Sequence, residues 1–582
     1  MSTWHSNIGA RNIARNLSVM TVAAWAGAVP ITSHGADPAG NTSSNSITAN
    51  PAYYDARPVL ETKNGKLQGV ERNGMVMFKN IPYAAPPVGD LRWRPPQPAR
   101  TWVDVRDASK FGQACMQPLV DGLTNELVPG SEDCLNLNVF APKGAKNRPV
   151  MLWIHGGGLL TGSASEPYFE PVGLVAEDVI VVTIDYRLGR LGFFAPKDLV
   201  EEARKNGEPF GNYGIMDQIQ ALKWVRDNIA TFGGDPGNVT IFGQSAGGRS
   251  VTWLMTSPAA AGLFHKAIAQ SPQQLPMRHL TQDRFGALAV QANDQKFIEA
   301  KGNKTLKELR ALPAGEASLT AADFITGGFD SAMIDGEIIL DDAIPLFTQG
   351  KQHKVPFMIG TNAWDASFFA LSAPSVSAYV EKMKQDPAMI ARLYKDFRYQ
   401  CGQALSPQIM ADGWYTGAVK LLAGSANKAA PAYAYYYSYI TPSLQGNYIG
   451  PAHTFELPYV FGALDTANLA PGKTAAVNPC QKIAEGIVDA KQKSKWSEYW
   501  FIVTTPGNRA DRSMARQLAK SWTTFAKTGN PNYDGRNIWP RYSIEHDVMR
   551  NFSNGPEGTI AKVDKARVDY QLEFIRAFYG IR

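Results

Sequence analysis

Short apolar runs alternate with longer amphipathic segments along most of this chain. The runs are rich in β-branched and aromatic residues and lie at 150–154, 179–184, 239–242, 267–269, 355–359 and 433–440, which predicts buried strands there. Between two of them, apolar residues recur at helical spacing over 215–231, and Gly233-Gly234 ends the pattern. This alternation predicts an α/β fold with a large, mostly parallel central sheet flanked by helices.

Helical patterns dominate from about Pro272 to Pro431, where the strand signal thins. We expect helical insertions that roof an active site rather than a second domain, so residues 57–582 are predicted to form one catalytic domain.

The first 36 residues are predicted to be a signal peptide. Arg11 and Arg15 precede an apolar segment, 17–29, that suits a signal-peptide core but is too short to span a bilayer comfortably. Cleavage could fall at 26–28 or at 33–36, and an uncleaved, disordered extension is the alternative. Residues 37–56 are polar and predict a flexible spacer. We therefore expect a secreted or periplasmic protein without stable membrane insertion.

Composition narrows the possible partners. The chain has 582 residues, 44% of them hydrophobic, which is enough for a substantial core. Its net charge of +6 arises from 58 basic and 52 acidic residues without a block of like charge, so we expect no nucleic-acid partner. The sequence leaves the oligomeric state open.

The chain contains four cysteines: Cys115, Cys134, Cys401 and Cys480. An even number in an exported chain permits two disulfides, and Cys115 with Cys134 would close a short loop, so we expect that pair. The pairing of Cys401 and Cys480 stays open. The cysteines and histidines lack metal-ligand spacing, and we expect no metal or other cofactor.

The most informative motif is Gly243-Gln244-Ser245-Ala246-Gly247, which directly follows the run 239–242. This G-x-S-x-G pattern between a strand and a helix is typical of a nucleophile elbow, in which Ser245 is the nucleophile. Side chains at positions 243 and 247 would collide with the neighbouring strand and helix. The alternative is a glycine-serine turn without chemistry.

A second glycine motif, His155-Gly156-Gly157-Gly158, follows the run 150–154. Unshielded backbone amides in such a loop can bind the oxygen of a tetrahedral intermediate, so Gly157, Gly158 and Ala246 are the predicted oxyanion-hole donors. A flexible glycine loop is the alternative interpretation.

A serine nucleophile also needs a base and an acid. Four of the eight histidines fit other places, namely the leader, the glycine loop or a packed position: His5, His34, His155 and His265. Among the rest, His279, His353, His453 and His546, we favour His453 because it lies in a loop after the strand 433–440. Asp365 is the predicted acid because it follows the strand 355–359, whereas Asp335, Asp341 and Asp342 precede that strand and fit a surface turn better.

Beyond these motifs, the chain resembles the type B carboxylesterase family of the α/β-hydrolase fold, which includes cholinesterases and bile-salt lipases. The resemblance rests on FKNIPYA (78–84), LRWRPP (91–96), SEDCLNLN (131–138), GNYGIMDQ (211–218), FGGDP (232–236) and FAKTGNP (525–531). It implies the same roles for Ser245, Asp365 and His453 and for the oxyanion donors. It also implies the Cys115–Cys134 disulfide and an ion pair between Arg92 and Glu132.

Three positions depart from the family pattern. Asp365 stands where glutamate is usual and is followed by Ala366 where glycine is usual. Gln244 replaces the glutamate that commonly precedes the nucleophile, so we expect weaker support for cationic alcohols such as choline. Pro272 replaces a usual glycine and alters a turn near the pocket.

The predicted function is therefore that of a serine carboxylesterase, which hydrolyses a small-molecule carboxylic ester through an acyl-enzyme on Ser245. A lipase for longer-chain acylglycerols, an amidase and a non-catalytic binding module on the same fold are the alternatives. Besides Gln244, several aromatic residues could line an acyl pocket or a lid, with core packing as the other interpretation: Trp364, Phe368, Phe369, Trp414 and Tyr415.

Overall fold

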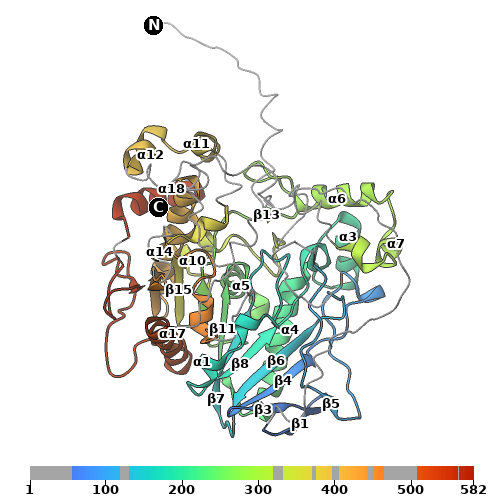
Figure 1. The fold of residues 1–582 in the computed structure, drawn as a ribbon. Helices are drawn as coiled ribbons and strands as arrows, with labels where there is room; N and C mark the ends of the chain where they lie inside the picture. The colour runs from blue at the N-terminus through green and yellow to red at the C-terminus, as the bar shows by residue number, and fades with distance from the viewer. Residues whose placement is uncertain are drawn as a thin grey trace, which may run out of the picture.

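A mixed sheet of ten strands forms the centre of the molecule (Figure 1). The computed structural model describes residues 55–117, 130–318, 332–369, 375–395, 405–442, 445, 450–464, 508–561 and 563–581. In spatial order the strands are β17 (Arg550–Phe552), β16 (Ala432–Tyr437), β15 (Phe357–Asn362), β12 (Lys266–Gln270), β11 (Gly234–Gln244), β7 (Arg148–Ile154), β8 (Ile180–Ile184), β6 (Asn136–Pro142), β4 (Met75–Pro82) and β3 (Val70–Arg72).

Strand direction divides the sheet into two parts. All neighbouring pairs from β17 to β8 are parallel, as the alternation of strand and helix predicts. The pairs β8–β6, β6–β4 and β4–β3 are antiparallel. The mostly parallel sheet is thus confirmed for the part that carries the predicted site motifs, and an antiparallel edge extends it.

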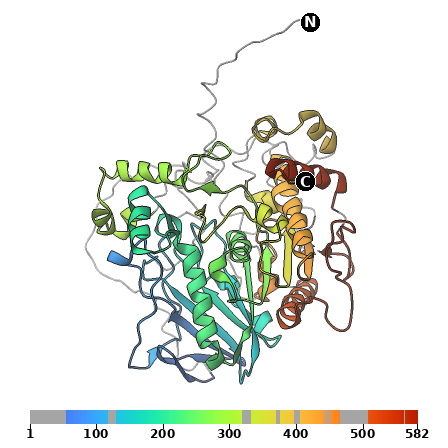
Figure 2. The ribbon, with the colours of Figure 1, turned by 180° about the vertical axis from the view of Figure 1, so that it is seen from behind.

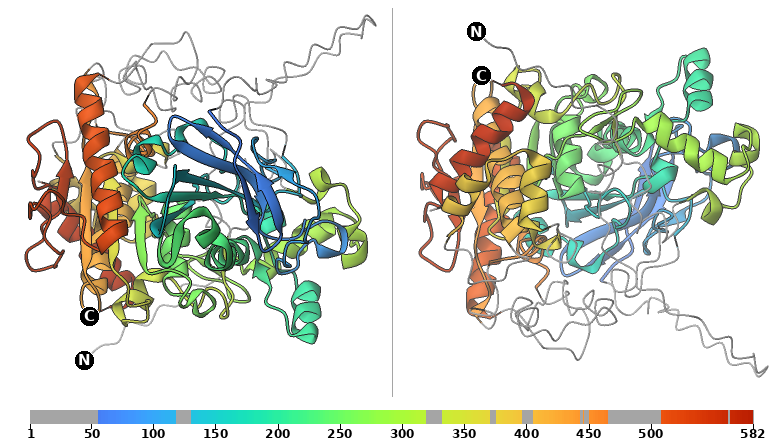
Figure 3. Two further views of the ribbon diagram at one scale, coloured as in Figure 1. Left: turned by 90° about the horizontal axis from the view of Figure 1, so that it is seen from below. Right: turned by 90° about the horizontal axis from the view of Figure 1, so that it is seen from above.

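Helices cover both faces of this sheet, as the views from behind and along the sheet show (Figures 2 and 3). On one face α1 (Val172–Val175), α15 (Leu457–Phe461) and α17 (Arg509–Thr528) pack together. On the other face lie α4 (Tyr213–Asn228), α5 (Ala246–Leu254) and α14 (Ala418–Ala426).

The alternation of side chains along β7 explains the two layers. Met151 and Trp153 join the core under α17, whereas Leu152 and Ile154 join the core under α4 and α5. All four side chains are buried because successive residues of a strand point to opposite faces and both faces are covered. A central strand that is covered on both faces therefore appears in the sequence as a continuous apolar run, as residues 150–154 do.

The region between β12 and β16 is mainly helical apart from β15 and the short strands β13 (Arg278–His279) and β14 (Met333–Ile334). In Figure 1, α6 and α7 lie at one end of the upper part of the molecule, and α11 and α12 lie at the other. The described helices of the region between β12 and β16 are α6 (Val290–Ala300), α7 (Leu306–Arg310), α8 (Ala314–Ala317), α10 (Ala343–Thr348), η6 (Asp365–Phe369), α11 (Val376–Met383), α12 (Pro387–Leu393), α13 (Leu405–Met410), the π-helix η8 (Ala411–Gly417) and α14. The C-terminal helix α18 (Lys565–Tyr579) packs on η8.

The described structure also contains smaller elements. They include β1 (Val59–Thr62), β2 (Gly65–Gln68), β5 (Arg106–Asp107), β9 (Phe193–Phe194), β10 (Gly211–Asn212), α2 (Gly189–Gly192), α3 (Lys197–Asn206) and the 3-10 helices η2 (Gly89–Leu91), η3 (Pro167–Phe169) and η5 (Pro258–Ala260). Within the described ranges, no helix has both the length and the apolar character needed to cross a membrane. The predicted signal peptide and nearly all of the spacer lie outside these ranges.

Most predicted boundaries shift by a few residues. The helix expected over 215–231 is α4, continued by a 3-10 turn, and Gly233 ends it in a left-handed conformation with φ 84°. β15 ends at Asn362 rather than at residue 359, and β16 ends at Tyr437 rather than at residue 440. Both differences arise at strand ends, where side-chain pattern constrains the backbone least.

Candidate active site

The loops that carry the predicted site residues meet at one edge of the sheet. In the parallel register Ile154 of β7 lies beside Gly243 of β11, and Gly243 lies beside Ala269 of β12. Ala269 in turn lies beside Ile359 of β15. Because all four strands run in the same direction, the segments that follow them emerge together, as is usual for sites in open α/β sheets.

Ser245 occupies the sharp turn between β11 and α5. Its backbone adopts φ 58° and ψ −122°, a conformation that is costly for a residue with a side chain. The Ser245 amide donates a hydrogen bond of 2.9 Å to the Gln270 carbonyl, which holds this turn against β12. A Cβ atom at Gly247 would lie 2.0 Å from the Ile154 carbonyl oxygen, and one at Gly243 would lie 2.6 Å from the backbone of Gly247. The steric reason for both glycines is therefore present at this turn.

The glycine loop after β7 lies directly against the serine. A Cβ atom at Gly156 would be 3.1 Å from the Cβ atom of Ser245. Gly157 has φ 97°, and a side chain there would meet the Thr161 carbonyl oxygen at 2.1 Å, so only glycine suits this position. Ala246 is the first residue of α5, where backbone N–H groups have no partner inside the helix.

His155 in this loop has a structural environment. Its ring is buried, stacks on Tyr186 with 4.4 Å between the ring centroids, and contacts the Gly156 carbonyl through Nδ1 at 2.8 Å. Burial lowers the pKa of His155 to about 4, so the ring is neutral at physiological pH. Tyr186 also donates a 2.7 Å hydrogen bond to the His155 carbonyl, which fixes the start of the glycine loop.

Asp365 and His453 form a close pair. Asp365 Oδ1 lies 2.5 Å from His453 Nδ1. The carboxylate is fully buried, and its Oδ2 accepts hydrogen bonds from the Thr361 hydroxyl at 2.5 Å and from the Asn362 amide at 2.9 Å. With three partners the carboxylate cannot rotate freely, and it presents one oxygen to the imidazole.

The loops that carry these two residues are joined through their backbones. Trp364 and Ala452 form a parallel β-bridge, and the Trp364 amide donates to the Pro451 carbonyl at 3.2 Å. The backbone amide of His453 also donates to the Ser367 hydroxyl at 3.1 Å. The distance between the carboxylate and the imidazole is therefore set by backbone contacts as well as by the side chains.

Gln244 connects His453 to the elbow. Its side-chain nitrogen lies 3.2 Å from His453 Nε2; Gln244 is buried, whereas His453 is half-buried. Because the Asp365 carboxylate accepts the proton of Nδ1, Nε2 of the neutral ring carries a lone pair and accepts from the Gln244 amide. The His453 ring is thus held by Asp365 at Nδ1 and by Gln244 at Nε2. Gln244 directly precedes Ser245 in the sequence.

A second buried carboxyl group, Glu456, lies next to this pair. It accepts hydrogen bonds from Asn362 Nδ2 at 2.7 Å and from Gln270 Nε2 at 3.2 Å. Burial, and then the negative charge of Asp365, raise the pKa of Glu456 to about 7. Sequence reasoning did not single out Glu456, Thr361 or Asn362. The His-x-x-Glu spacing from His453 is the signal that could have indicated Glu456.

The predicted pocket residues divide into three groups. Trp364 and Trp414 are buried in the interior. Tyr415, on η8, is also buried, and its ring meets that of His453 edge to face at 6.0 Å between centroids. Phe368 and Phe369 belong to η6, but their side chains lie outside the described part of the structure.

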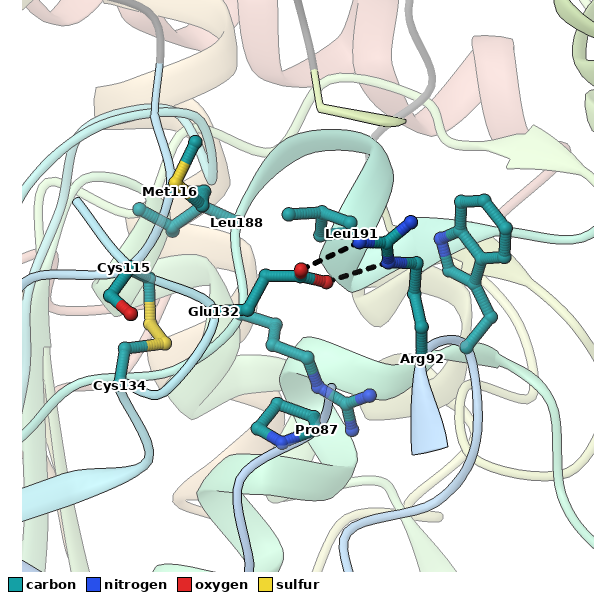
Figure 4. A pocket seen from close by; sticks show the side chains of 11 residues that line it. Pro87, Arg92, Cys115, Met116, Glu132, Cys134, Leu188 and Leu191 are labelled. Carbon is teal, nitrogen blue, oxygen red and sulfur yellow. Dashed lines mark hydrogen bonds and ion pairs between the residues drawn. A yellow bond between two sulfur atoms is a disulfide. The ribbon is translucent and has the colours of Figure 1, made fainter. Parts of the chain in front are cut away.

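The Cys115–Cys134 disulfide is present, which confirms that prediction. It borders a small cavity of about 10 Å³, which has room for roughly one water molecule (Figure 4). The Arg92–Glu132 pair closes one side of this cavity with two hydrogen bonds of 2.7 and 2.6 Å. The disulfide and the ion pair join segments that are distant in the sequence and so stabilise the fold around this cavity. Cys401 and Cys480 lie outside the described residues.

The other candidates for functional groups are a metal-binding cluster and the rival acids of the sequence analysis, Asp335 and Asp342. In the described ranges, no group of three or more histidine, cysteine, aspartate or glutamate residues is arranged to hold a metal ion. Asp342 is buried, which corrects the expectation of a surface turn, and its Oδ2 lies 3.2 Å from Arg284. The rival acid Asp335 accepts hydrogen bonds from the loop residues that follow it and from Asn212.

The sequence and the fold of this chain are similar to those of known proteins. The profile of the Carboxylesterase family matches residues 56–470, which is more than half of the chain. This chain belongs to the carboxylesterase family. The chain is therefore a serine carboxylesterase, that is, a carboxylic ester hydrolase, and it has the α/β-hydrolase fold.

Individual relatives cover most of the chain. Fumonisin B1 esterase of Sphingopyxis macrogoltabida is 32% identical and aligns with 85% of this chain and 86% of its own length. Para-nitrobenzyl esterase of Bacillus subtilis is 33% identical and aligns with 84% of this chain and 93% of its own length. The crystal structure of a Geobacillus stearothermophilus carboxylesterase superposes with a TM-score of 0.70 at 29% identity and covers 89% of this chain and all (100%) of its own. The lipase alternative is not favoured by these names.

Proposed function

We propose that this carboxylesterase works through a catalytic triad of Ser245, His453 and Asp365. The observation that carries the proposal is the 2.5 Å contact between Asp365 Oδ1 and His453 Nδ1, formed by a fully buried carboxylate beside the strained elbow. A carboxylate in this position selects the imidazole tautomer whose Nε2 can accept a proton, and it stabilises the imidazolium that results.

In the proposed reaction, the Ser245 hydroxyl oxygen attacks the ester carbonyl carbon while its proton moves to His453 Nε2. The carbonyl oxygen becomes an oxyanion, which the amides of Gly157, Gly158 and Ala246 bind. The carbon–oxygen bond to the alcohol then breaks, and the imidazolium returns the proton to the leaving alkoxide. Water, deprotonated in turn by His453, attacks the acyl-enzyme and releases the acid and free Ser245.

Gln244 has a defined part in this cycle. In the resting site its amide donates to Nε2 at 3.2 Å, so Nε2 must exchange this hydrogen bond for one from the Ser245 hydroxyl before attack. A neutral amide also places no negative charge beside the imidazolium or the departing alcohol. We infer that this site supports neutral alcohols better than cationic ones such as choline.

The proposal extends to compartment and substrates. A disulfide in the described structure suits an oxidising compartment, which agrees with the predicted signal peptide and with export. Small-molecule esters are the proposed substrates. Because the Bacillus subtilis relative is a para-nitrobenzyl esterase, para-nitrobenzyl esters are the first substrates to test.

The deciding experiment compares wild type with Ser245→Ala on para-nitrophenyl acetate and para-nitrobenzyl acetate. We expect the variant to lose turnover by at least about 10³-fold while it melts like wild type, because only the attacking oxygen is removed. Ser377→Ala, an exposed serine on α11, is the matched control and should retain full activity. An organophosphonate should label wild type and the control but not Ser245→Ala. Turnover by purified Ser245→Ala, or its labelling, would contradict the proposal.

A further inference from the structure

The glycine loop after β7 has a backbone that needs support. Gly157, Gly158 and Leu159 all have positive φ angles, of 97°, 68° and 63°. Glycine adopts such angles readily, but for leucine they are costly, so the loop keeps this shape only where neighbouring groups hold it. One such contact is the 2.7 Å hydrogen bond from the Gly189 amide to the Leu159 carbonyl. The directions of the proposed oxyanion donors therefore depend on contacts around the loop.

Thr161 holds the peptide that joins the two glycine donors. The Gly157 carbonyl accepts hydrogen bonds from the amides of Leu160 and Thr161, at 3.0 Å each, and from the Thr161 hydroxyl at 3.3 Å. This peptide is planar and trans, so its carbonyl and its N–H point in opposite directions. Fixing the Gly157 carbonyl therefore also fixes the direction of the Gly158 N–H.

Gln117 holds the residue that follows Thr161. Its Nε2 donates to the Gly162 carbonyl at 3.1 Å, and its Oε1 accepts from the Gly162 amide at 3.1 Å. Gly162 has φ 105°, and a Cβ atom there would lie 2.5 Å from His155 Nδ1, so its backbone packs against that ring. One side-chain amide thus satisfies both the donor and the acceptor of a loop residue that has no neighbouring strand.

The segment that carries Gln117 is itself well anchored. Cys115 is bonded to Cys134 in the disulfide, and the Met116 amide donates to the Ser131 carbonyl at 3.1 Å. Nε2 of Gln117 also donates to the Cys115 carbonyl at 3.1 Å, which orients the side chain. Gln117 therefore links a covalently fastened segment to the glycine loop, 45 residues further along the chain.

We propose that Gln117 is a positioning residue of the proposed oxyanion hole. By binding Gly162 it fixes the end of the loop, and through Thr161 and the Gly157 carbonyl it keeps the Gly158 amide directed at the reacting oxygen. It acts through the loop backbone rather than by contact with the substrate. The proposal rests on the proposed function, because it needs the oxyanion donors, and it adds a residue outside the G-x-S-x-G and glycine motifs.

The first test is Gln117→Met, which keeps the length of the side chain and removes its donor and acceptor. We expect kcat/KM for para-nitrophenyl acetate to fall about 10- to 100-fold, mainly through kcat, because a misdirected amide weakens binding of the transition state more than of the substrate. Gln220→Met is the matched control. Gln220, on α4, is also half-buried and also donates to a backbone carbonyl, that of Tyr83 at 3.5 Å. It should keep wild-type kcat.

Two ketones separate positioning from packing. With a phenylethyl trifluoromethyl ketone, the Ser245 oxygen bonds to the carbonyl carbon, the carbonyl oxygen becomes an oxyanion, and the serine proton moves to His453. The matching methyl ketone resists this addition and reports ordinary binding. We expect Gln117→Met to raise the Ki of the trifluoromethyl ketone by about the factor by which kcat/KM falls, with the Ki of the methyl ketone within about threefold of wild type.

A second pair of variants tests the next link and does not need Gln117→Met to fold. Thr161→Val keeps the shape of the side chain but removes the hydroxyl that binds the Gly157 carbonyl. We expect it to lower kcat/KM and to weaken the trifluoromethyl ketone about three- to tenfold, the worth of one hydrogen bond. Thr161→Ser should recover most of this loss because it keeps the hydroxyl.

The outcomes that count against the proposal are distinct. Equal weakening of both ketones in Gln117→Met would assign Gln117 a packing role and overturn the inference, as would Thr161→Val with the full wild-type preference for the trifluoromethyl ketone. A wild type that binds both ketones equally would instead contradict Ser245 as the nucleophile and so the proposed function. A wild type that prefers the trifluoromethyl ketone, with the same preference in Gln117→Met, would leave the proposed function intact and remove this inference alone.

Discussion

Replacing Asp365 by asparagine is the sharpest test of the proposed acid. Two donors, the Thr361 hydroxyl and the Asn362 amide, hold Oδ2, while Oδ1 faces His453 Nδ1. In the variant the amide oxygen should keep the position of Oδ2, because both donors remain there. The NH₂ group must then face Nδ1, and the imidazole has to accept at Nδ1 and carry its proton on Nε2. In that tautomer His453 cannot accept the proton of Ser245.

The size of the effect follows from the same contact. With 2.5 Å between the carboxylate oxygen and the ring nitrogen, the charges of the carboxylate and the imidazolium are centred about 4 Å apart. At an effective dielectric constant of about 20, such a pair attracts by about 4 kcal/mol. Since about 1.4 kcal/mol corresponds to a tenfold change in rate, we expect kcat to fall about 10³-fold, and the wrong tautomer can only add to this loss.

The assay is steady-state hydrolysis of para-nitrophenyl acetate, with Ser245→Ala as the blank and thermal unfolding as the check on folding. Asp342→Asn is the matched control, because Asp342 is also a buried aspartate but pairs with Arg284 rather than with His453. Asp365→Glu should retain more activity than Asp365→Asn, since it keeps the charge while adding one methylene to a filled site. A folded Asp365→Asn enzyme within tenfold of wild type would refute this reasoning.

Two further predictions concern stability. The pKa of Glu456 rises from 4.5 in the unfolded chain to about 7, so the folded protein binds this proton more tightly. The resulting stability is present below pH 4.5 and is lost as the pH rises through 7; Glu456→Gln should remove up to about 3 kcal/mol of the decline in unfolding free energy between pH 5 and 8. Replacing both Cys115 and Cys134 by serine should lower the unfolding free energy by about 3 kcal/mol, because a 19-residue link no longer restrains the unfolded chain.

Urea unfolding monitored by tryptophan fluorescence measures both effects. For Glu456, parallel pH profiles of wild type and variant would show that the carboxyl group stays ionised in the folded state. For the disulfide, wild type treated with a thiol reductant should match the double variant, and a midpoint that does not move in either sample would contradict the estimate.

The sequence carried strong signals for the parallel part of the sheet and for the order of the site motifs. Runs such as 150–154 are continuous and apolar because β7 is covered on both faces. Glycines at 157 and 247 mark backbone positions that a side chain could not share, so their pattern is local and readable. The pairing of Asp365 with His453 followed from chain order and strand ends. Their catalytic roles, like those of the oxyanion donors, stay predictions.

Other features depend on contacts between distant residues and could not be predicted in the same way. In the sequence Glu456 looks like a surface glutamate. Only the structure shows that Asn362 and Gln270 donate hydrogen bonds to it. Likewise, Asp342 resembles a turn residue in sequence, yet Arg284 and the Met277 amide hold it in the interior. A local sequence pattern does not report whether a charged side chain is buried, since burial depends on residues that are distant in the sequence and pack around it.

The backbone bridge between Trp364 and Ala452 has a consequence for how this enzyme can evolve. It joins the turn that carries Asp365 to the turn that carries His453, whereas the chain between these two residues passes through helices such as α11 and α12 and through the sheet strand β16. Changes of length or sequence in α11 and α12, outside the sheet, can therefore occur without separating the two turns. Selection can act on these helices while the contact between Asp365 and His453 keeps its spacing.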